Sequence, residues 1–328
     1  MFMWEIDLGY RADLQETFAR LEDKKSVLSQ ARPLPSIAVE KIKESLSIEW
    51  TYHSNSIEGN TLSLRETQMV LQEGITVKGK SLREHFEAKN HDTALQLLVK
   101  LVNQKTALSS SVILDIHQLV LRSIEDDYAG RLRTGGVRIM GANFVPPNAR
   151  KVPDLLDELV DFVLENPLQL NTLELATIFH HKFVWIHPFF DGNGRTVRLL
   201  MNLLLMNDGY TPAIILSNDR KKYYDALNQA NKGNYKKLTL LMAQALERTL
   251  NIFLKILPEY DLDYQPISDI VREESLPYSS EYISLLARQG KIDAHKEGRN
   301  WHTTKEAILN YIETRKRQRD VGGYETIN

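Results

Sequence analysis

The sequence predicts a mainly helical protein that ends in a small module of mixed α and β structure. Nearly every long segment before residue 258 carries apolar residues at helical spacing, which predicts a bundle of helices. Residues 130–153 are instead rich in Gly, Pro and Asn, and two short apolar runs within them predict a hairpin. After a polar, linker-like stretch at 260–266, the pattern of residues 279–312 predicts a helix, a turn, two strands and a helix.

Residues that commonly begin and end helices separate the predicted elements. Pro33 and Pro35 divide the first two helices, and Pro258 ends the last helix of the bundle. The Asn60-Thr61 pair begins another helix, as a capping region does. Helices are therefore predicted at residues 12–31, 37–57, 61–73, 81–102, 111–124, 152–165, 172–186, 195–206, 220–231 and 235–257.

Length and composition fit a cytoplasmic globular protein. The 328 residues allow about two domains, and a formal net charge of -2 offers no general attraction for nucleic acid. The sequence contains no cysteine, which excludes disulfides and thiolate chemistry. Its first residues do not form a secretory signal, and no run of about 18 apolar residues predicts a membrane span. We therefore expect a cytoplasmic protein without a membrane partner.

The stretch from His187 to Arg198 combines a histidine, a carboxylate, two glycines and two arginines in one turn that enters a helix. Gly192 and Gly194 flank Asn193. Glycine allows positive φ and close approach of the backbone, so successive N–H groups can form an anion-binding nest. A helix N-terminus also favours phosphate through its free N–H groups and its dipole. The turn therefore predicts a site for phosphate groups.

Polar side chains around this turn support the interpretation. The helix that follows is apolar nearly all round except for Arg195, Arg198 and Asn202, which share one face. Buried arginines need an anion, and a phosphate at the nest would provide one. Asp191 is placed to hold Mg²⁺ through its carboxylate beside substrate phosphates, and His187 is placed to accept a proton.

Two other interpretations of the same residues are less favourable. A purely structural turn gains nothing from burying two arginines without partners. A metal-hydrolase site would use His180, His181, His187 and Asp191. However, His180 and His181 are adjacent and cannot share one helix face, no His-x-x-x-His pair is present, and the glycines and arginines would have no role.

The turn matches the pattern H-x-F-x-[DE]-G-N-G-R-x-x-R at every fixed position, and by this motif the chain resembles Fic-domain proteins. The resemblance implies a Fic-type helical bundle that transfers AMP from ATP to a Ser, Thr or Tyr hydroxyl of a protein and releases pyrophosphate. It implies that His187 is the general base, that Asp191 holds the Mg²⁺ bridging the phosphates, and that Phe189 anchors the loop. The implied catalytic residues are His187, Asp191, Asn193, Arg195 and Arg198. The implied phosphate-binding residues are Gly192, Asn193, Gly194, Arg195 and Arg198.

A second informative pattern lies far upstream, at residues 54–62. By itself it reads as the end of a helix, with Gly59 in the C-cap signal. Many Fic proteins carry an inhibitory motif [ST]-x-x-x-E-[GN], and Ser54, Glu58 and Gly59 fit it. The resemblance therefore implies that Glu58 pairs with Arg198 and occupies the fork that would otherwise hold the γ-phosphate of ATP.

Two further assignments follow from the same resemblance. In Fic proteins a β-hairpin flap beside the active site adds the target segment as an extra strand, and Arg131 to Pro147 resembles that flap. A protein substrate is therefore expected to dock there, with little dependence on its sequence. A later helix of Fic proteins carries a tyrosine and an asparagine near the adenosine, which picks out Tyr224 and Asn231. The alternative for residues 220–231 is a helix without a binding role, with a basic, solvated first turn followed by core contacts.

The segment 279–312 resembles the winged-helix modules of excisionase-like DNA-binding proteins. Between residues 266 and 320, ten Lys and Arg are nearly balanced by nine Asp and Glu, which does not favour strong non-specific DNA binding. A docking or dimerising module is the preferred interpretation, and DNA contact is the alternative. Three regions are expected: residues 1–108 with the inhibitory helix, 109–258 as the Fic catalytic core, and 259–328 as linker and module.

Two classes of function stay open from the sequence. The first is an AMP-transferring enzyme held in check by Glu58, which acts on a protein partner or on itself, as a monomer or a homodimer. The second is a nucleotide-sensing regulator that binds DNA. Within the enzyme class, transfer of UMP, phosphocholine or phosphate remains open, as does removal of AMP in a reaction that uses Glu58.

Overall fold

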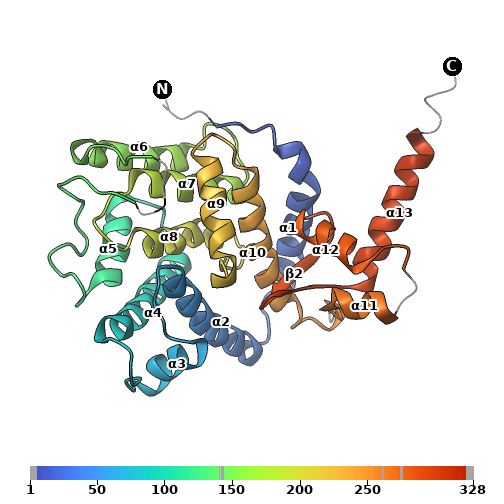
Figure 1. Cartoon of the computed structure of the whole chain (residues 1–328), viewed down its shortest axis with the longest axis horizontal. Helices are drawn as coiled ribbons and strands as arrows, with labels where there is room; N and C mark the ends of the chain where they lie inside the picture. Colours follow the sequence, from blue (N-terminus) through green and yellow to red (C-terminus); the bar gives the residue numbers. More distant parts are fainter. Residues whose placement is uncertain (1–5, 140, 142–143, 261, 274–275, 323–328) are drawn as a thin grey trace.

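The computed structural model describes residues 6–139, 141, 144–260, 262–273 and 276–322, and most of them are helical, as predicted (Figure 1). The α-helices are α1 (Arg11–Gln30), α2 (Ser36–Ile57), α3 (Leu64–Gln68), α4 (Leu82–Asn103), α5 (Ser110–Leu121), α6 (Val152–Glu165), α7 (Thr172–Ile186), α8 (Asn193–Asn207), α9 (Arg220–Ala230), α10 (Lys236–Leu254), α11 (Ile267–Glu273), α12 (Ser280–Arg288) and α13 (Lys305–Gly322). The short helical turns are η1 (Met69–Glu73), η2 (Ala149–Lys151), η3 (Ser217–Asp219) and η4 (Pro258–Tyr260), and the strands are β1 (Gln265–Pro266), β2 (Ala294–Glu297) and β3 (Asn300–Thr303).

Helix α8 lies at the centre of the bundle. It packs against α7, α4, α5 and α2, and most of its side chains are buried, as its nearly continuous apolar sequence requires. Asn202, the third polar residue of its predicted polar face, is used to hold the chain. Its amide donates to the carbonyls of Arg198 and Ala213 and accepts the N–H of Ala213. Asn202 therefore fixes the segment that follows α8. Arg195 and Arg198 are the residues of this polar face that remain available to the turn before α8.

Capping boxes set where three helices begin. The side chains of Ser63, Ser81 and Asn171 each accept a backbone N–H, and a glutamate three residues later binds back to the capping residue. The helix predicted at 61–73 therefore begins at Leu64 and continues from α3 into the π-helical turn η1.

The N-terminal region and the expected catalytic core share one hydrophobic core. It extends from Tyr10, just before α1, to Leu257, just after α10. The C-terminal module has a separate core that includes Ile283, Leu286 and Ile308. Among the residues that the structure describes, no helix is long and apolar enough to cross a membrane.

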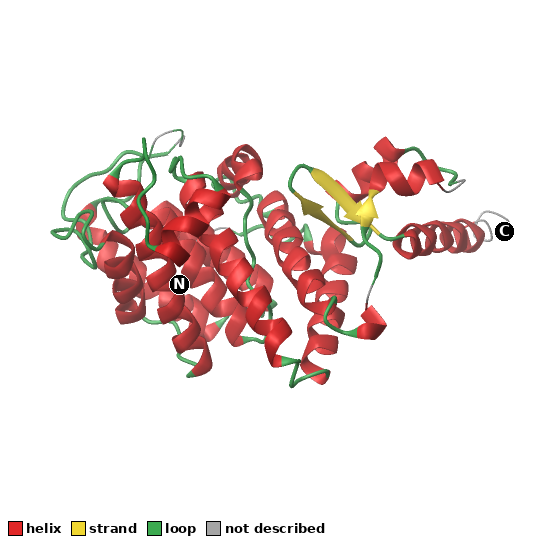
Figure 2. Ribbon diagram, turned by 90° about the horizontal axis from the view of Figure 1, so that it is seen from below, coloured by secondary structure: helices red, strands yellow, loops and turns green. Residues whose placement is uncertain are grey.

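The C-terminal module contains a three-stranded antiparallel sheet in the order β1-β3-β2 (Figure 2). Strands β2 and β3 form the predicted pair, with Lys296 opposite Trp301. Strand β1 was not predicted, because it lies in the stretch interpreted as a linker and pairs Gln265 with Thr303. A two-residue strand has no room for an alternating pattern, so only its partner reveals it. Helix α11, which follows β1, was not predicted either.

One set of contacts between the bundle and this module uses the module's backbone carbonyls. The donors are polar side chains of α1 and α10, the two helices that lie along the junction in Figure 1. The contacts are Thr17 and Arg20 to the carbonyl of Gly290, Gln244 to the carbonyls of Ala287 and Arg288, and Arg248 to the carbonyl of Lys296.

A buried ion cluster completes the junction. The ammonium of Lys24 donates to Glu247 at 2.9 Å, to Asn251 at 2.7 Å and to Asp293 of the module at 2.6 Å. Glu247 also accepts two hydrogen bonds from Arg20. Because Glu247 is almost completely buried, these cations are what make its charge tolerable there.

The hairpin predicted at 131–147 has no strand among its described residues, and residues 140, 142 and 143 lie outside the part that the structure describes. Arg133 instead holds the base of this loop, since its guanidinium donates to the carbonyls of His187, Gly135 and Pro147. An isolated two-stranded hairpin is marginal in water, and glycine and proline disfavour the ladder. The Gly- and Pro-rich sequence of this loop therefore gives irregular backbone anchored by one arginine.

Candidate active site

The turn between α7 and α8 forms a nest at a helix N-terminus. Gly192 is the N-cap of α8 with φ +75° and, as glycine, has no side chain with which to cap the helix. The first N–H groups of α8 are therefore available to an anion. The amide of Asn193 donates to the carbonyl of Phe189 at 2.9 Å and accepts its N–H at 3.0 Å. Through these two hydrogen bonds, Asn193 holds the turn in the conformation that forms the nest.

Arg198 is buried and bound to the end of α2. Its Nη2 lies 2.8 Å from the carboxylate of Glu58 and 2.8 Å from the carbonyl of Ser54, and its Nε donates to the Ser54 hydroxyl at 3.1 Å. Gly59 follows at φ +103°, a conformation that suits glycine. The ion pair implied by the inhibitory motif is therefore present in the structure.

The carboxylate of Glu58 lies directly over the nest. A Cβ atom built on Gly194 would collide with Oε1 of Glu58, so the glycine is what allows this close approach. Next to it, Nε of Arg195 and Nη1 of Arg198 are buried, and within the described part of the chain they have no hydrogen-bond acceptor. Buried cationic donors without acceptors are costly. The unsatisfied donors and the nest together fit a ligand with several phosphate oxygens.

His187 connects α7 to the nest in a left-handed conformation, with φ +50°. Such backbone geometry is unfavourable for a non-glycine residue and often occurs at functional sites. The carbonyl of His187 accepts a hydrogen bond from Arg133 at 2.7 Å, which helps to hold it. Burial lowers the pKa of His187 to about 4, and Arg133 acts in the same direction, whereas Glu58 and Asp191 oppose the shift. The imidazole is therefore neutral near pH 7 and able to accept a proton.

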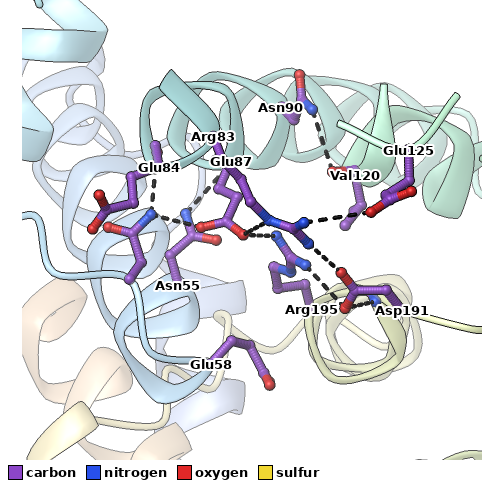
Figure 3. Close-up of polar contacts among 12 residues, drawn as sticks. Asn55, Glu58, Arg83, Glu84, Glu87, Asn90, Val120, Glu125, Asp191 and Arg195 are labelled. Carbon is purple, nitrogen blue, oxygen red and sulfur yellow. Dashed lines mark hydrogen bonds and ion pairs between the residues drawn. The ribbon is translucent and has the colours of Figure 1, made fainter. Parts of the chain in front are cut away.

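Asp191 lies at the edge of the nest between two cations (Figure 3). Its Oδ1 accepts the N–H of Gly192 at 2.6 Å and lies 3.5 Å from Arg195, and its Oδ2 accepts a hydrogen bond from Arg83 at 2.6 Å. Burial by itself would raise the pKa of Asp191, but Arg195, the Gly192 N–H and Arg83 together lower it below its usual range. The carboxylate is therefore ionised and could hold a cation.

Known proteins similar to this chain are found by sequence and by structure. A model described as the Fic/DOC family matches residues 107–205. A solved structure of Fic-1 from C. elegans is 32% identical with a TM-score of 0.69, and the match covers 77% of this chain and 74% of that chain. The chain belongs to the Fic/DOC family.

Relatives of this Fic chain match it well beyond residues 107–205. Protein adenylyltransferase Fic from Aedes aegypti is 34% identical over 286 residues, which is 87% of this chain and 56% of the relative. A Fic domain containing signaling protein from Bacteroides thetaiotaomicron is 26% identical with a TM-score of 0.66, over 73% of this chain and 96% of that chain. The Fic chain thus spans a little over half the length of the curated mosquito relative.

The two residues assigned to the adenosine lie on α9 of the Fic fold or at its end. Tyr224 is half-buried, and the guanidinium of Arg220 lies 5.0 Å from the centre of its ring. Arg220 also donates to the carbonyl of Ile57 at 2.7 Å, which links α9 to the end of α2. The amide oxygen of Asn231, the C-cap of α9, lies 2.8 Å from Nε2 of His181. Contact of Tyr224 and Asn231 with adenosine remains a prediction.

The histidines of the metal-hydrolase alternative are used inside the Fic core. His180 is hydrogen-bonded to the hydroxyl of Tyr223 at 3.1 Å, and His181 to the hydroxyl of Tyr235 at 2.8 Å and to Asn231. Over the described ranges of the chain, no group of three or more His, Cys, Asp or Glu residues could hold a metal ion by itself. Asp191 nevertheless fits Mg²⁺, which commonly uses one or two protein carboxylates together with substrate phosphates.

Helix α4 contributes two charged residues to the Fic site that the sequence analysis missed (Figure 3). Arg83 reaches Asp191, as described above. Glu87, one turn later, has Oε1 3.2 Å from Nη1 of Arg195, while its Oε2 accepts a hydrogen bond from Asn60 at 2.8 Å. Charged residues on a polar helix face give no local signal of such a role, because their partners lie far away in the sequence.

The sequence analysis missed a third residue, His117 of α5, which packs against the turn between α7 and α8. Its ring stacks on Phe189 with centroids 3.5 Å apart, and its Nε2 lies 2.9 Å from the carbonyl of Asp191. The N–H of Gly130 donates to Nδ1 of His117, so Nε2 is the nitrogen that carries the proton. The sequence did contain one indication of this role, since His117 is a polar residue on the apolar face of a predicted helix.

Proposed function

We propose that this Fic chain transfers AMP from ATP to a Ser, Thr or Tyr hydroxyl of a protein, and that Glu58 holds it inactive. The observation that carries the proposal is the Glu58–Arg198 ion pair over the nest, because it puts a protein carboxylate where the phosphate-binding groups converge. The name of the mosquito relative, Protein adenylyltransferase Fic, supports this reaction. It belongs to a longer protein, of which this chain spans 56%.

In the proposed reaction, neutral His187 accepts the proton of the target hydroxyl. The hydroxyl oxygen then bonds to the α-phosphorus while the bond from that phosphorus to the bridging β-phosphate oxygen breaks, so pyrophosphate leaves. The N–H groups of the nest, together with Arg195 and Arg198, stabilise the phosphate charge. Asp191 would hold Mg²⁺, which neutralises part of this charge when it is bound. While Arg198 is paired with Glu58, its fork is not available to ATP.

We also propose that the protein target docks along 131–147 as an added strand. Arg133 supports this placement, because it ties the base of the loop to the carbonyl of His187, the proposed base. A strand paired there would be held close to the reacting groups through its backbone, whatever its side chains. The same geometry allows a second copy of this chain to be the target.

The DNA-binding alternative has less support from the described residues. Lys296, on β2, is bound to Asp219 of the bundle at 2.6 Å and is therefore already neutralised. Gel shifts of the full chain on duplex DNA at several salt concentrations test this alternative, since phosphate contacts weaken steeply with salt. Tight, salt-sensitive binding would favour the regulator over the enzyme. A homodimer and a cytoplasmic location remain expectations from the sequence.

Mass spectrometry of proteins incubated with the full chain, ATP and Mg²⁺ tests the proposed reaction. We expect adducts with the mass of AMP on hydroxyl side chains when Glu58→Gly is used, few with the wild type, and none with the double variant Glu58→Gly/His187→Ala. An adduct of another mass would assign a different transferred group. Loss of AMP from a previously modified protein, dependent on Glu58, would instead assign the removal reaction.

A further inference from the structure

Arg83 is bound to the carboxylate oxygen that a metal ion would need. It projects from the first turn of α4 toward the edge of the nest, and Figure 3 shows its guanidinium among Glu87, Glu125 and Asp191. Its Nη2 lies 2.6 Å from Oδ2 of Asp191, which is the shortest of its three carboxylate contacts. Oδ1 of Asp191 is engaged with the N–H of Gly192, so Oδ2 is the oxygen through which Asp191 can reach a cation at the phosphates.

We propose that Arg83 is a positioning residue that occupies the metal-binding oxygen of Asp191 in the nucleotide-free protein, and that binding of Mg²⁺ with nucleotide displaces it. This inference rests on the proposed function for the assignment of Asp191 to Mg²⁺. Both the guanidinium and Mg²⁺ are cations that bind oxygen at short range, and like charges at such distances repel. Oδ2 therefore accommodates one of them at a time.

The surroundings allow Arg83 to leave Asp191 without becoming unpaired. Its Nε lies 3.4 Å from Glu87 and its Nη1 lies 3.5 Å from Glu125, so two carboxylates remain to hold it. The side chain is 48% exposed, and movement into water is open to it. Asp191 would keep its own position through the N–H of Gly192 and through Arg195.

The resting site then contains one protein-made substitute for a phosphate and one for the metal ion of a magnesium–nucleotide complex. Glu58 places an anion over the nest, where a phosphate would bind. Arg83 places a cation on Asp191, where Mg²⁺ would bind. The two substitutes come from different helices, α2 and α4, and act on different atoms.

Calorimetric titration of the full chain with ADP, in the presence and absence of Mg²⁺, tests this proposal. ADP is chosen because it has no γ-phosphate to compete with Glu58. The ratio of the two dissociation constants measures how strongly Mg²⁺ assists the nucleotide. For Arg83→Gln we expect unchanged affinity for ADP alone and about two- to fivefold tighter binding with Mg²⁺, the size expected for an exposed ion pair. Arg83→Lys should restore most of the wild-type ratio.

Two further variants make the outcome specific. Arg272→Gln removes an exposed arginine paired with Asp269 outside the site, and it should leave both constants unchanged. Asp191→Asn should remove most of the assistance by Mg²⁺. If Asp191→Asn acts in this way but Arg83→Gln does not change the ratio, or if it weakens ADP binding without metal, the role of Arg83 is refuted while the proposed function stands. If Asp191→Asn leaves the ratio unchanged, the metal assignment and the inference fail together.

Discussion

Glu58 fills the space in which any side chain at position 194 would begin. A methyl group on Gly194 would overlap Oε1 of Glu58, while its other near neighbour, Nη1 of Arg198, would be 3.0 Å away. Position 194 lies in the first turn of α8 and its backbone is helical. The backbone conformation at position 194 therefore does not demand glycine. Glycine is required there because the carboxylate of Glu58 leaves no room for a side chain.

Gly194→Ala should destabilise the wild type but not the Glu58→Gly variant. In the wild type the new methyl group forces Glu58 off Arg198, which costs about 1–3 kcal/mol, as overpacking does. Without Glu58 only the tight contact with the movable end of Arg198 remains. Alanine is favoured over glycine in a helix by roughly 1 kcal/mol. Chemical denaturation of the four proteins of this cycle measures the coupling. Additive changes in the free energy of unfolding would mean that the two residues do not meet.

Glu58→Gly should raise AMP transfer roughly ten- to hundredfold, because hydrogen bonds to charged groups contribute roughly 1.5–3 kcal/mol. The reason is that Arg198 becomes free for phosphate. Gln104→Gly is a matched control, since Gln104 is the C-cap of α4 with φ -86°, close to the φ of -85° at Glu58, the C-cap of α2. Incorporation of labelled AMP into protein measures the rate. Equal rates in wild type and Glu58→Gly would contradict autoinhibition.

His187→Ala, made in the Glu58→Gly background, should lower transfer by roughly 10²–10⁴, the range for loss of a general base. Affinity for ADP with Mg²⁺ should stay within a few-fold, because His187 is assigned to the target hydroxyl and not to the phosphates. Calorimetry beside the transfer assay separates the two effects. A variant that loses nucleotide affinity and rate in parallel would place His187 in binding instead.

The transfer rate of Glu58→Gly should remain level from pH 8 down to pH 6. A histidine with an ordinary pKa of about 6.5 would lose about fourfold of its neutral form between pH 7.5 and 6. Burial instead lowers the pKa of His187 to about 4, so its neutral form persists throughout this range. Glu58 raises the pKa of His187, so removal of Glu58 shifts the loss of activity at acid pH to a still lower pH. Initial rates at saturating ATP and Mg²⁺ provide the profile, and a midpoint near 6.5 would disprove the shift.

Lys24→Met should destabilise the protein by roughly 3–5 kcal/mol, the cost of breaking a buried ion pair by removing one partner. Lys24 has three partners in the junction, and the module's Asp293 is one of them. Lys25→Met is the control, because the carboxylates that Lys25 meets, Glu22 and Asp208, are about half exposed and contribute roughly 0–1 kcal/mol. Urea denaturation compares the two. Similar losses of unfolding free energy from both substitutions would show that the buried ion cluster contributes no more than an exposed ion pair.

Local patterns account for what the sequence analysis predicted and for what it missed. The turn from His187 to Arg198 carries its chemistry within one short stretch, and the inhibitory segment matches a motif of its own, so both could be recognised. Arg83 could not, because it looks like any exposed helical arginine and its partner, Asp191, is far away in the sequence. The missed strand β1 is defined by pairing with β3 and not by its own residues.

The junction between the bundle and the C-terminal module places demands on a small part of the module's sequence. Four donors of α1 and α10 bind carbonyl oxygens of the module, which every residue type possesses. Side chains of the module take part as well: Asp293 binds Lys24, Lys296 binds Asp219, and His295 is hydrogen-bonded to Asn251. Gly290 has to be small because a Cβ there would press on Leu240 and Thr17. A different module joined to this bundle would therefore need the same loop path, a glycine at position 290 and polar side chains that match Lys24, Asp219 and Asn251. The bundle thus recognises its neighbour by the course of the backbone together with a few polar side chains, which leaves the outer surface of the module free to diverge.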